Sequence, residues 1–419
     1  MNLIKNISFV FFLLGISFSY QAQISTLTND DAIIYVEHNA EIYVEGDVLI
    51  KNTGVIDNSG AIYLENDWIN NSVFNVFLNS SPGEVIFSGI DQKITGIKST
   101  LFYNLTTQNI GTKSLFLDTW VENRLDLDNS EVQLHANLLH LYNPDPNSLI
   151  WSTGFISGDS LGGYFQRTTD RIAPYMFPVG GLGLLDVHRA IEITPSSSDS
   201  SVFGVRMAEI NSDADFTGTS MTGSTGPFLR THAEPRAVNV NEKFYHNIAR
   251  FYGTSNLSVK MFYFQSDEPS IHDFNNVSFW KNSVPRWTIG TYTENEALGY
   301  LNIGNPYKYM SGTITDFSND VYSLVVRDKD DVYIPQIFSP NGDGINDILF
   351  AYGHRFESMQ LIIYNRLGER VFETTDNKIG WDGKFRGRDA QSGVYVYYLK
   401  GKILEGGNIT RKGDITLVR

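Results

Sequence analysis

The stretch Gly54-Val55-Ile56-Asp57-Asn58-Ser59-Gly60-Ala61-Ile62-Tyr63-Leu64 alternates glycine or asparagine with apolar residues. Around it, apolar residues recur at every sixth position, at Val44, Ile50, Ile56, Ile62 and Trp68. All of these positions are even, and such parity is typical of strands with one buried face. A fixed period is typical of repeat architectures, and glycine and asparagine tolerate the positive φ of tight corners. The stretch therefore predicts short rungs of a β-solenoid, with an ordinary meander as the alternative.

The same pattern continues to about residue 141, so residues 23–142 are assigned to the solenoid-like region. Val85 and Phe87 alternate, and alternation resumes from Leu115 to Leu127. The parity shifts at Val132 and Leu134, which indicates a bulge or a corner. Helix-forming residues never recur with a 3.6-residue period over about 12 positions, so the sequence predicts an all-β, multidomain protein.

A composition change at residues 143–147, which read Asn-Pro-Asp-Pro-Asn, favours a domain boundary. We expect a β domain over residues 143–225 and a β-sandwich over residues 226–331. Strand-like runs separated by turn signals support the sandwich, at residues 244–251, 257–264, 277–281 and 322–326. Trp280 and Trp287 fit sugar stacking or core packing, and core packing is the commoner role.

Residues 332–419 carry the most specific motifs in the chain. These are Ile334-Pro335-Gln336-Ile337-Phe338-Ser339-Pro340-Asn341-Gly342-Asp343-Gly344-Ile345-Asn346-Asp347, Tyr364-Asn365-Arg366-Leu367-Gly368, Trp381-Asp382-Gly383, Gly393-Val394-Tyr395-Val396-Tyr397-Tyr398 and Lys412-Gly413-Asp414-Ile415-Thr416-Leu417-Val418. In this order they resemble the gliding-motility-associated C-terminal domain, the type B sorting domain of the type IX secretion system of Bacteroidetes. The resemblance implies an Ig-like β-sandwich, the type IX secretion machinery as partner, and export to the cell surface or the medium. It does not extend to the cargo that precedes residue 332.

Within this segment, residues 361–364 and 371–372 predict a hairpin around the turn at residues 365–369, and Trp381 is expected in the core. Val394, Val396 and Tyr398 alternate with Tyr395, Tyr397 and Leu399, so both faces of this strand are apolar. Such a strand is expected to be central or covered on both sides. The last strand, residues 415–418, is expected to offer an edge that a partner reads by strand addition.

Residues 1–22 have the order of a secretory signal peptide. Lys5 is their only charge, an apolar run extends from Ile7 to Ile16, and we expect cleavage after Ala22. The run is too short for a membrane-spanning helix, which needs about 20 apolar residues. No second apolar stretch follows, so we expect no transmembrane anchor.

The chain has 419 residues, no cysteine and a formal net charge of −15. This length allows about three or four domains. An acidic surface repels phosphate backbones, which argues against nucleic-acid binding. The absence of cysteine excludes disulfides, thiol catalysis, cysteine–zinc sites and a lipid-modified cysteine.

Three patterns are reminiscent of catalytic motifs, and each lacks its context. Gly158-Asp159-Ser160-Leu161 spells the GDSL hydrolase signature, but Asp186-Val187-His188 is one residue short of the required Asp-x-x-His block. Gly180-Gly181-Leu182-Gly183 lacks the spacing and the helix of a nucleotide-binding turn. The eight histidines form no zinc-binding frame. We therefore predict no catalytic residues.

The segment from Ser339 to Asp347 is the best candidate for a metal site. Asn341 and Asp343 match positions three and five of a calcium loop, and Asp347 fits position nine. Phe350 stands where such a loop has its bidentate glutamate. Asn341, Asp343 and Asp347 are therefore candidate calcium ligands, with an Asx-stabilised turn as the alternative.

Three classes of function remain: a non-enzymatic structural or adhesin-like protein, a polysaccharide-binding or polysaccharide-degrading solenoid, and a small-ligand or calcium-dependent module. The degrading solenoid needs clustered acids with a base, and no basic residue accompanies Asp57, Glu65 and Asp67, although Asp91 is also present. We predict the first class, with a surface glycan or a protein as the ligand.

Overall fold

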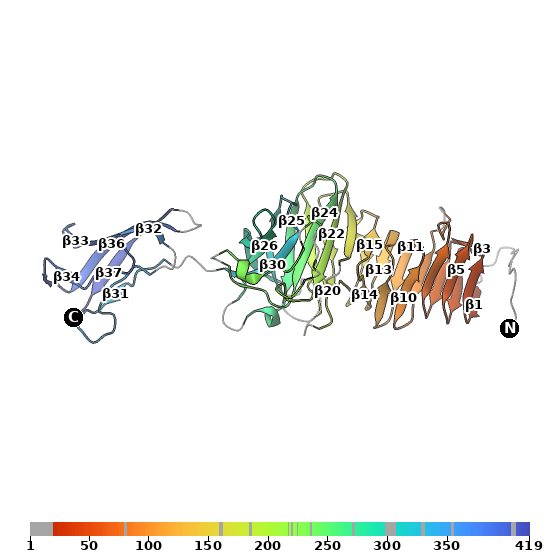
Figure 1. The fold of residues 1–419 in the computed structure, drawn as a ribbon, viewed down its shortest axis with the longest axis horizontal. Coiled ribbons are helices and arrows are strands. Elements are labelled where there is room, and N and C mark those ends of the chain that lie inside the picture. The colour runs from red at the N-terminus through yellow and green to blue at the C-terminus, as the bar shows by residue number, and fades with distance from the viewer. Residues whose placement is uncertain are drawn as a thin grey trace. The chain divides into compact units, whose positions relative to one another are not determined.

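The computed structural model describes residues 20–78, 82–158, 162–183, 187–216, 218, 221–223, 225–234, 237–269, 273–297, 307–327, 332–352, 356–403 and 408–419. The predicted signal peptide therefore lies almost wholly outside the described residues, and its cleavage stays a prediction. The chain divides into two compact units, residues 1–327 and 328–419 (Figure 1). Strands dominate both units, as predicted for an all-β protein. Among the described residues, three 3-10 helices occur, all in the first unit: η1 Pro146–Ser148, η2 Arg230–His232 and η3 Gln265–Asp267.

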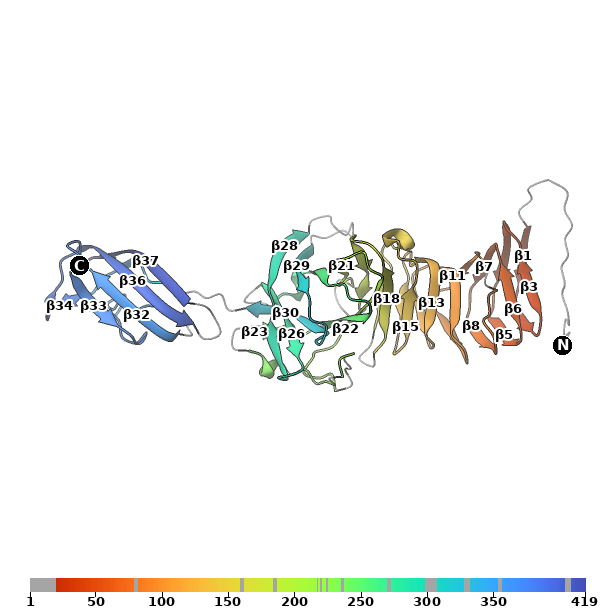
Figure 2. The ribbon, with the colours of Figure 1, turned by 90° about the horizontal axis from the view of Figure 1, so that it is seen from above.

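The first unit begins with a β-solenoid of about seven turns, whose strands stack in parallel along one axis (Figure 2). One sheet stacks β1 Tyr20–Ile24, β4 Ala40–Val44, β7 Ala61–Leu64, β9 Glu84–Phe87, β11 Thr100–Thr107, β13 Thr119–Asp126, β15 Leu138–Leu141 and β18 Tyr164–Thr169, and β16 Leu149–Ile150 pairs with β13. The second stacks β2 Leu27–Asp30, β5 Val48–Asn52, β8 Trp68–Ser72, β10 Gln92–Gly96, β12 Thr112–Leu115, β14 Glu131–Gln133, β17 Phe155–Ser157 and β20 Val179–Gly180. A short third sheet pairs β3 Ile33–Val36 with β6 Val55–Asn58. The solenoid prediction is thus confirmed over the meander.

The six-residue period marks the inward positions of the rungs. Val44, Ile50, Ile56, Ile62 and Trp68 belong to five consecutive strands, and each is at most 1% exposed. In the sheets, Ile42 lies beside Ile62 and Val48 beside Trp68, so one turn takes 20 residues here. Three strand-and-corner units of about six or seven residues therefore make one turn, and each unit contributes at least one buried apolar side chain.

Gly54 and Gly60 serve the corners for a different reason from the predicted one, whereas Gly96 has the predicted positive φ, at 130°. Gly60 does not have a positive φ; instead, a Cβ there would lie 2.2 Å from the carbonyl oxygen of Ala40 in the preceding rung. Asn52 does adopt a positive φ, at 50°. Asn58 is buried, donates to the Glu84 carbonyl at 3.1 Å and accepts from the Gly60 amide at 3.1 Å. Asparagine therefore joins successive rungs, and glycine lets their backbones approach closely.

The parity shift at Val132 and Leu134 reflects a change in rung length. Lys113 lies beside Val132, so this turn takes 19 residues and buried positions change from odd to even. A register irregularity also occurs in the other sheet, where β11 pairs with β13, between Phe102 and Asn104. The shift itself falls at the corner between β13 and β14, where Asp128 has a φ of 42°, so the corner is found there rather than a bulge.

Beyond β18 the parallel sheet continues as an antiparallel one. β18 pairs in parallel with β15 and antiparallel with β22, and the sheet goes on through β24, β30, β26 and β27, with β23 beside β30. Their bounds are β22 Ser201–Ala208, β23 Ala237–Val240, β24 Tyr245–Tyr252, β26 Asn276–Lys281, β27 Arg286–Ile289 and β30 Val321–Arg327. A second sheet contains β19 Tyr175–Phe177, β21 Ile191–Pro195, β25 Leu257–Tyr263, β29 Tyr307–Ile314 and β28 Tyr292–Ala297. One apolar core extends from Val36 to Val326. The predicted boundaries near residues 143, 226 and 332 stay predictions.

Trp280 and Trp287 pack inside the antiparallel part. They are 5% and 0% exposed, and their rings meet edge to face at 5.6 Å. Trp287 Nε1 donates to the Phe228 carbonyl at 3.0 Å. Core packing is therefore the role of both tryptophans, and sugar stacking is not.

The second unit has a five-stranded sheet in the order β31, β37, β36, β32, β33. Its strands are β31 Ile337–Phe338, β32 Phe356–Tyr364, β33 Arg370–Thr374, β36 Gly393–Ile403 and β37 Asn408–Leu417, and β34 Lys384–Phe385 pairs with β35 Arg388–Asp389. The predicted hairpin is β32–β33. Trp381 is fully buried, 4.9 Å from the Tyr395 ring and 5.2 Å from the Phe338 ring, so its predicted place in the core is confirmed.

Candidate functional site

The aspartates of the solenoid corners bind backbone amides of the next rung. Asp67 Oδ1 accepts from the Lys93 amide at 2.9 Å, and Asp91 Oδ1 accepts from the Thr112 amide at 3.0 Å. The same contact recurs at Asp31, Asp47 and Asp118. Two of the four acids considered for polysaccharide cleavage, Asp67 and Asp91, thus have a structural role in joining the rungs.

Lys113 interacts electrostatically with Asp91, and it faces the solenoid interior. Its side chain is buried, and Nζ donates to the carbonyls of Gly89 and Ile90 at 2.6 and 2.8 Å. Burial lowers the pKa of Lys113 to about 8. A lysine with that pKa suits proton abstraction, but a base that cleaves a polymer must reach the surface, and Lys113 does not.

The outward face of the first solenoid sheet presents side chains in register from rung to rung. The rings of Tyr43 and Tyr63 stack at 4.4 Å with 6° between their planes. Leu101, Trp120 and His140 follow one another across β11, β13 and β15, and the exposed Tyr142 stacks on His140 at 4.1 Å. Asn104, Asn123 and Asn143 form a ladder of amide hydrogen bonds at 2.8 and 3.0 Å. This face is therefore a regular, aromatic-bearing surface.

The motifs that resemble catalytic sites gain no support. Asp159, Ser160 and Leu161 of the GDSL pattern and Asp186 lie outside the described residues. Gly180 ends β20, and the next described element is the strand β21, so no nucleotide-binding helix follows among the described residues. Within the described part of the chain, no three His, Asp or Glu side chains are grouped to hold a metal ion.

Two buried histidines make the first unit sensitive to acid. Burial lowers the pKa of His140 and of His246 to about 4. His246 Nε2 lies 2.8 Å from the Arg189 carbonyl, and its Nδ1 has no hydrogen-bond partner among the described residues, so protonation leaves a buried N–H unpaired.

We expect the contribution of these two histidines to stability to be constant above their ordinary pKa of 6.5 and to fall between pH 6.5 and 4, because the unfolded histidines take up protons there first. The loss is at most about 3 kcal/mol per histidine. Thermal melts across this range test the expectation, and H140Q/H246Q is the control, whose melting temperature should depend less on pH. An equal pH dependence of both proteins would contradict the assignment.

The candidate calcium ligands are brought together in one loop, where they bind backbone amides. Asp347 accepts from the amides of Gly342 and Gly344 at 2.6 and 2.8 Å. Asp343 accepts from the Ile345 amide at 2.8 Å and from the Asn341 side chain at 2.9 Å. The Ile345 hydrogen bond is the largest cause of a lowered pKa of Asp343. These contacts form an Asx-type turn, and calcium binding by Asn341, Asp343 and Asp347 stays a prediction.

This loop opens the unit that contains the Trp381 core and the β36–β37 hairpin, in the order that the sequence motifs predicted. Residues 332–417 match the CHU_C type IX secretion signal domain. The C-terminal unit is a type IX sorting domain. No curated protein matches the chain. A domain of this family directs export by the type IX secretion system to the cell surface or the medium. None of the described helices is long and apolar enough to cross a membrane.

In the sorting domain, β36 is central in its sheet, as predicted. One of its faces is nevertheless open in the described structure, because Val394, Val396 and Tyr398 are 55%, 44% and 38% exposed. Opposite faces of one strand thus differ: Tyr395 and Leu399 are buried. The two apolar faces of β36 therefore predicted its central position correctly, but one of these faces has no covering layer among the described residues.

The open edge of the sorting domain differs from the predicted one. Thr416 and Val418 donate to the carbonyls of Gln336 and Phe338, so the last residues of β37 are paired with β31. Among the described residues, no strand pairs with that side of β37 over residues 408–414. Because amides alternate in direction along a strand, Thr410, Lys412 and Asp414 direct their amides to this open edge. The available edge therefore lies before Ile415.

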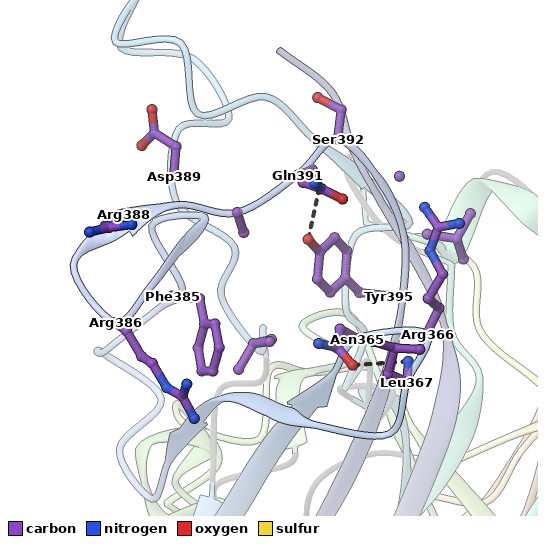
Figure 3. A pocket seen from close by; sticks show the side chains of 14 residues that line it. Asn365, Arg366, Leu367, Phe385, Arg386, Arg388, Asp389, Gln391, Ser392 and Tyr395 are labelled. Carbon is purple, nitrogen blue, oxygen red and sulfur yellow. Dashed lines mark hydrogen bonds between the residues drawn. The ribbon is translucent and has the colours of Figure 1, made fainter.

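A cavity of about 640 Å³ lies at the turn end of the sorting domain (Figure 3). The turn 365–367, the β34–β35 hairpin and residues 390–395 surround it. Three arginines line it, Arg366, Arg386 and Arg388, and the sequence reasoning missed them. The run Lys384-Phe385-Arg386-Gly387-Arg388, with three cations in an acidic chain, was the signal available for two of them.

Proposed function

We propose that this protein is a non-enzymatic, adhesin-like protein that the type IX system delivers to the cell surface or the medium. The observation that supports this proposal is the regular outer face of the solenoid, with Tyr43 and Tyr63 stacked in register and Trp120 beside His140. A rigid row of side chains at the strand spacing of about 4.8 Å suits contact with an extended ligand. The side chains of Asp67, Asp91 and Lys113 bind the backbone of neighbouring rungs and so stabilise the solenoid, which agrees with a protein that binds a ligand without cleaving it.

A polysaccharide ligand is favoured by the aromatic content of this face. Tyr142, which directly follows β15 and is 43% exposed, stacks on the buried His140, and His140 lies beside Trp120 of β13. Exposed aromatic rings offer sugars an apolar surface with a polar rim. The face therefore fits polysaccharide binding better than cleavage.

Tyr142→Ala is expected to weaken binding to a responsive polysaccharide by about fivefold to tenfold, since one stacking contact contributes about 1 kcal/mol. A panel of polysaccharides and affinity electrophoresis of the mature protein test this. Tyr35→Ala is the matched control, because Tyr35 is 60% exposed on β3, away from this face. Depolymerised product would favour the enzyme, and equal losses in both variants would contradict the assigned face.

Export requires that the machinery recognise the sorting domain, and we assign this contact to the open edge of β37. Its free amides at Thr410, Lys412 and Asp414 permit β-strand addition, in which the main chain supplies the hydrogen bonds. Cationic side chains on edge strands oppose pairing with arbitrary strands. Arg411 and Lys412 therefore favour an acidic extended segment of the partner over neutral or basic ones.

A further inference from the structure

The arginine-lined cavity lies in a domain whose net charge is opposite in sign to that of the rest of the chain. Residues 332–419 contain 12 Lys and Arg and 10 Asp and Glu, whereas residues 1–331 contain 20 and 37. The sorting domain is thus slightly cationic on a strongly acidic chain. Within the cavity lining, three arginines face one acid, Asp389, and Asp389 lies 3.3 Å from Arg419.

Arg386 occupies a backbone position that disfavours it. It has a φ of 51° and precedes Gly387 at 77°, so the two residues form the β34–β35 turn with positive φ at both positions. Asparagine or aspartate is usual at the first of these positions, and a long side chain there is strained. The Arg386 guanidinium contacts Glu369 at 3.0 Å and the Phe385 ring at 4.8 Å. The strained backbone therefore places a positioned guanidinium at the cavity wall.

Arg366 and Arg388 are the uncompensated charges of the cavity. Neither side chain has a hydrogen bond or an ion pair in the described part of the chain. Arg366 extends along the backbone of Gly393, its Nη2 being 3.8 Å from the position of a Cβ there. In Figure 3, Arg366 lies on one side of the Phe385 and Tyr395 rings, and Arg386 and Arg388 lie on the other. A bound anion would supply the counter-charge that these two guanidinium groups lack among the described residues.

We propose that this cavity binds a small molecule or saccharide unit that carries a carboxylate or a phosphate. Guanidinium groups bind both anions by charge-assisted and often bidentate hydrogen bonds. The apolar walls at Val371, Phe385 and Tyr395 accommodate the body of the ligand. A volume of about 640 Å³ exceeds that of an inorganic ion and falls within the range of small-ligand sites.

Calorimetric titration of the full mature protein tests this site, with pyrophosphate as the phosphate probe and citrate as the carboxylate probe. We expect saturable binding of at least one probe, which weakens with salt. R366Q/R388Q is expected to reduce the affinity by about 100-fold or more, since each of the two charge-assisted contacts contributes at least about 1.5 kcal/mol. The probe that binds identifies the anion class.

K378Q/K400Q is the control, because it removes two positive charges from the same domain outside the cavity lining. Its affinity is expected to equal that of the unaltered protein. The proposal is overturned by the absence of saturable binding of both probes at millimolar concentration, or by an equal loss in the control. Melting temperatures of both variants show that the domain is folded. The outcome is independent of export and of the solenoid ligand.

Discussion

Export is expected to stop when residues 412–419 are deleted, with the protein retained in the periplasm. The deletion removes Ile415 and Leu417, which are 0% and 1% exposed in the core of the sorting domain. It also removes Arg419, whose guanidinium donates to the carbonyls of Gly383 and Ala390 at 2.8 and 3.0 Å. The deletion also removes the part of β37 that pairs with both β31 and β36. Fractionation of cells and medium measures the effect, and secretion at the normal level would refute it.

The deletion cannot separate recognition from folding, so Lys412→Pro is the sharper variant. Proline at position 412 removes one amide from the open edge and leaves the bonds to β36, which come from the odd-numbered residues around it. We expect exported protein to fall to about a tenth or less, with an unchanged melting temperature of the domain, because a strand-adding partner loses a main-chain hydrogen bond and meets a steric obstacle.

Lys412→Ala is the matched control, since it removes the charge and keeps the amide. Its export is expected to exceed that of Lys412→Pro, and any reduction reports the side-chain charge alone. Normal export of the folded proline variant would show that the machinery reads another surface, for example the exposed face around Val394 and Val396. The sorting function itself would stand in that case, because the deletion tests it separately.

The solenoid could be predicted from sequence because its period is a direct consequence of its geometry. Each strand turns apolar side chains inward at alternate positions, so Val44, Ile50 and Ile56 mark successive strands of one turn. The reason for the corner glycines could not be predicted in the same way. The close approach of Gly60 to Ala40 depends on which rungs stack, and stacking joins residues 20 positions apart.

The sorting domain was predictable from its motifs, but its sites were not. The open edge at residues 408–414 exists because β31 is too short to pair with them. A strand of two residues shows no alternation that the sequence could reveal. The cavity is lined by three arginines from two turns. These turns lie about 20 residues apart in the sequence, so the sequence does not show that they meet. The loop from Asn341 to Asp347 is a further example. Its acids have the spacing of calcium ligands, but in the folded chain they accept hydrogen bonds from backbone amides.

Trp68→Ala is expected to cost about 3–5 kcal/mol of unfolding free energy, the range for removal of a buried tryptophan. The side chain is fully buried between the rings of Phe77 and Phe102, at 5.6 and 5.2 Å. Its Nε1 also donates to Thr100 Oγ1 at 3.0 Å, so the substitution leaves a buried hydroxyl with one partner fewer. Because each rung packs only on its neighbours, a cavity here interrupts the continuous core of the solenoid.

Urea unfolding of the mature protein, followed by circular dichroism, measures this cost. Ile69→Ala is the matched control: Ile69 follows Trp68 on β8, points outward and is half-buried. Its substitution is expected to cost less than about 1 kcal/mol. The difference between neighbours tests the parity of the rung, because a strand directs successive side chains to opposite faces. Equal costs at positions 68 and 69 would contradict the inward assignment of the six-residue period.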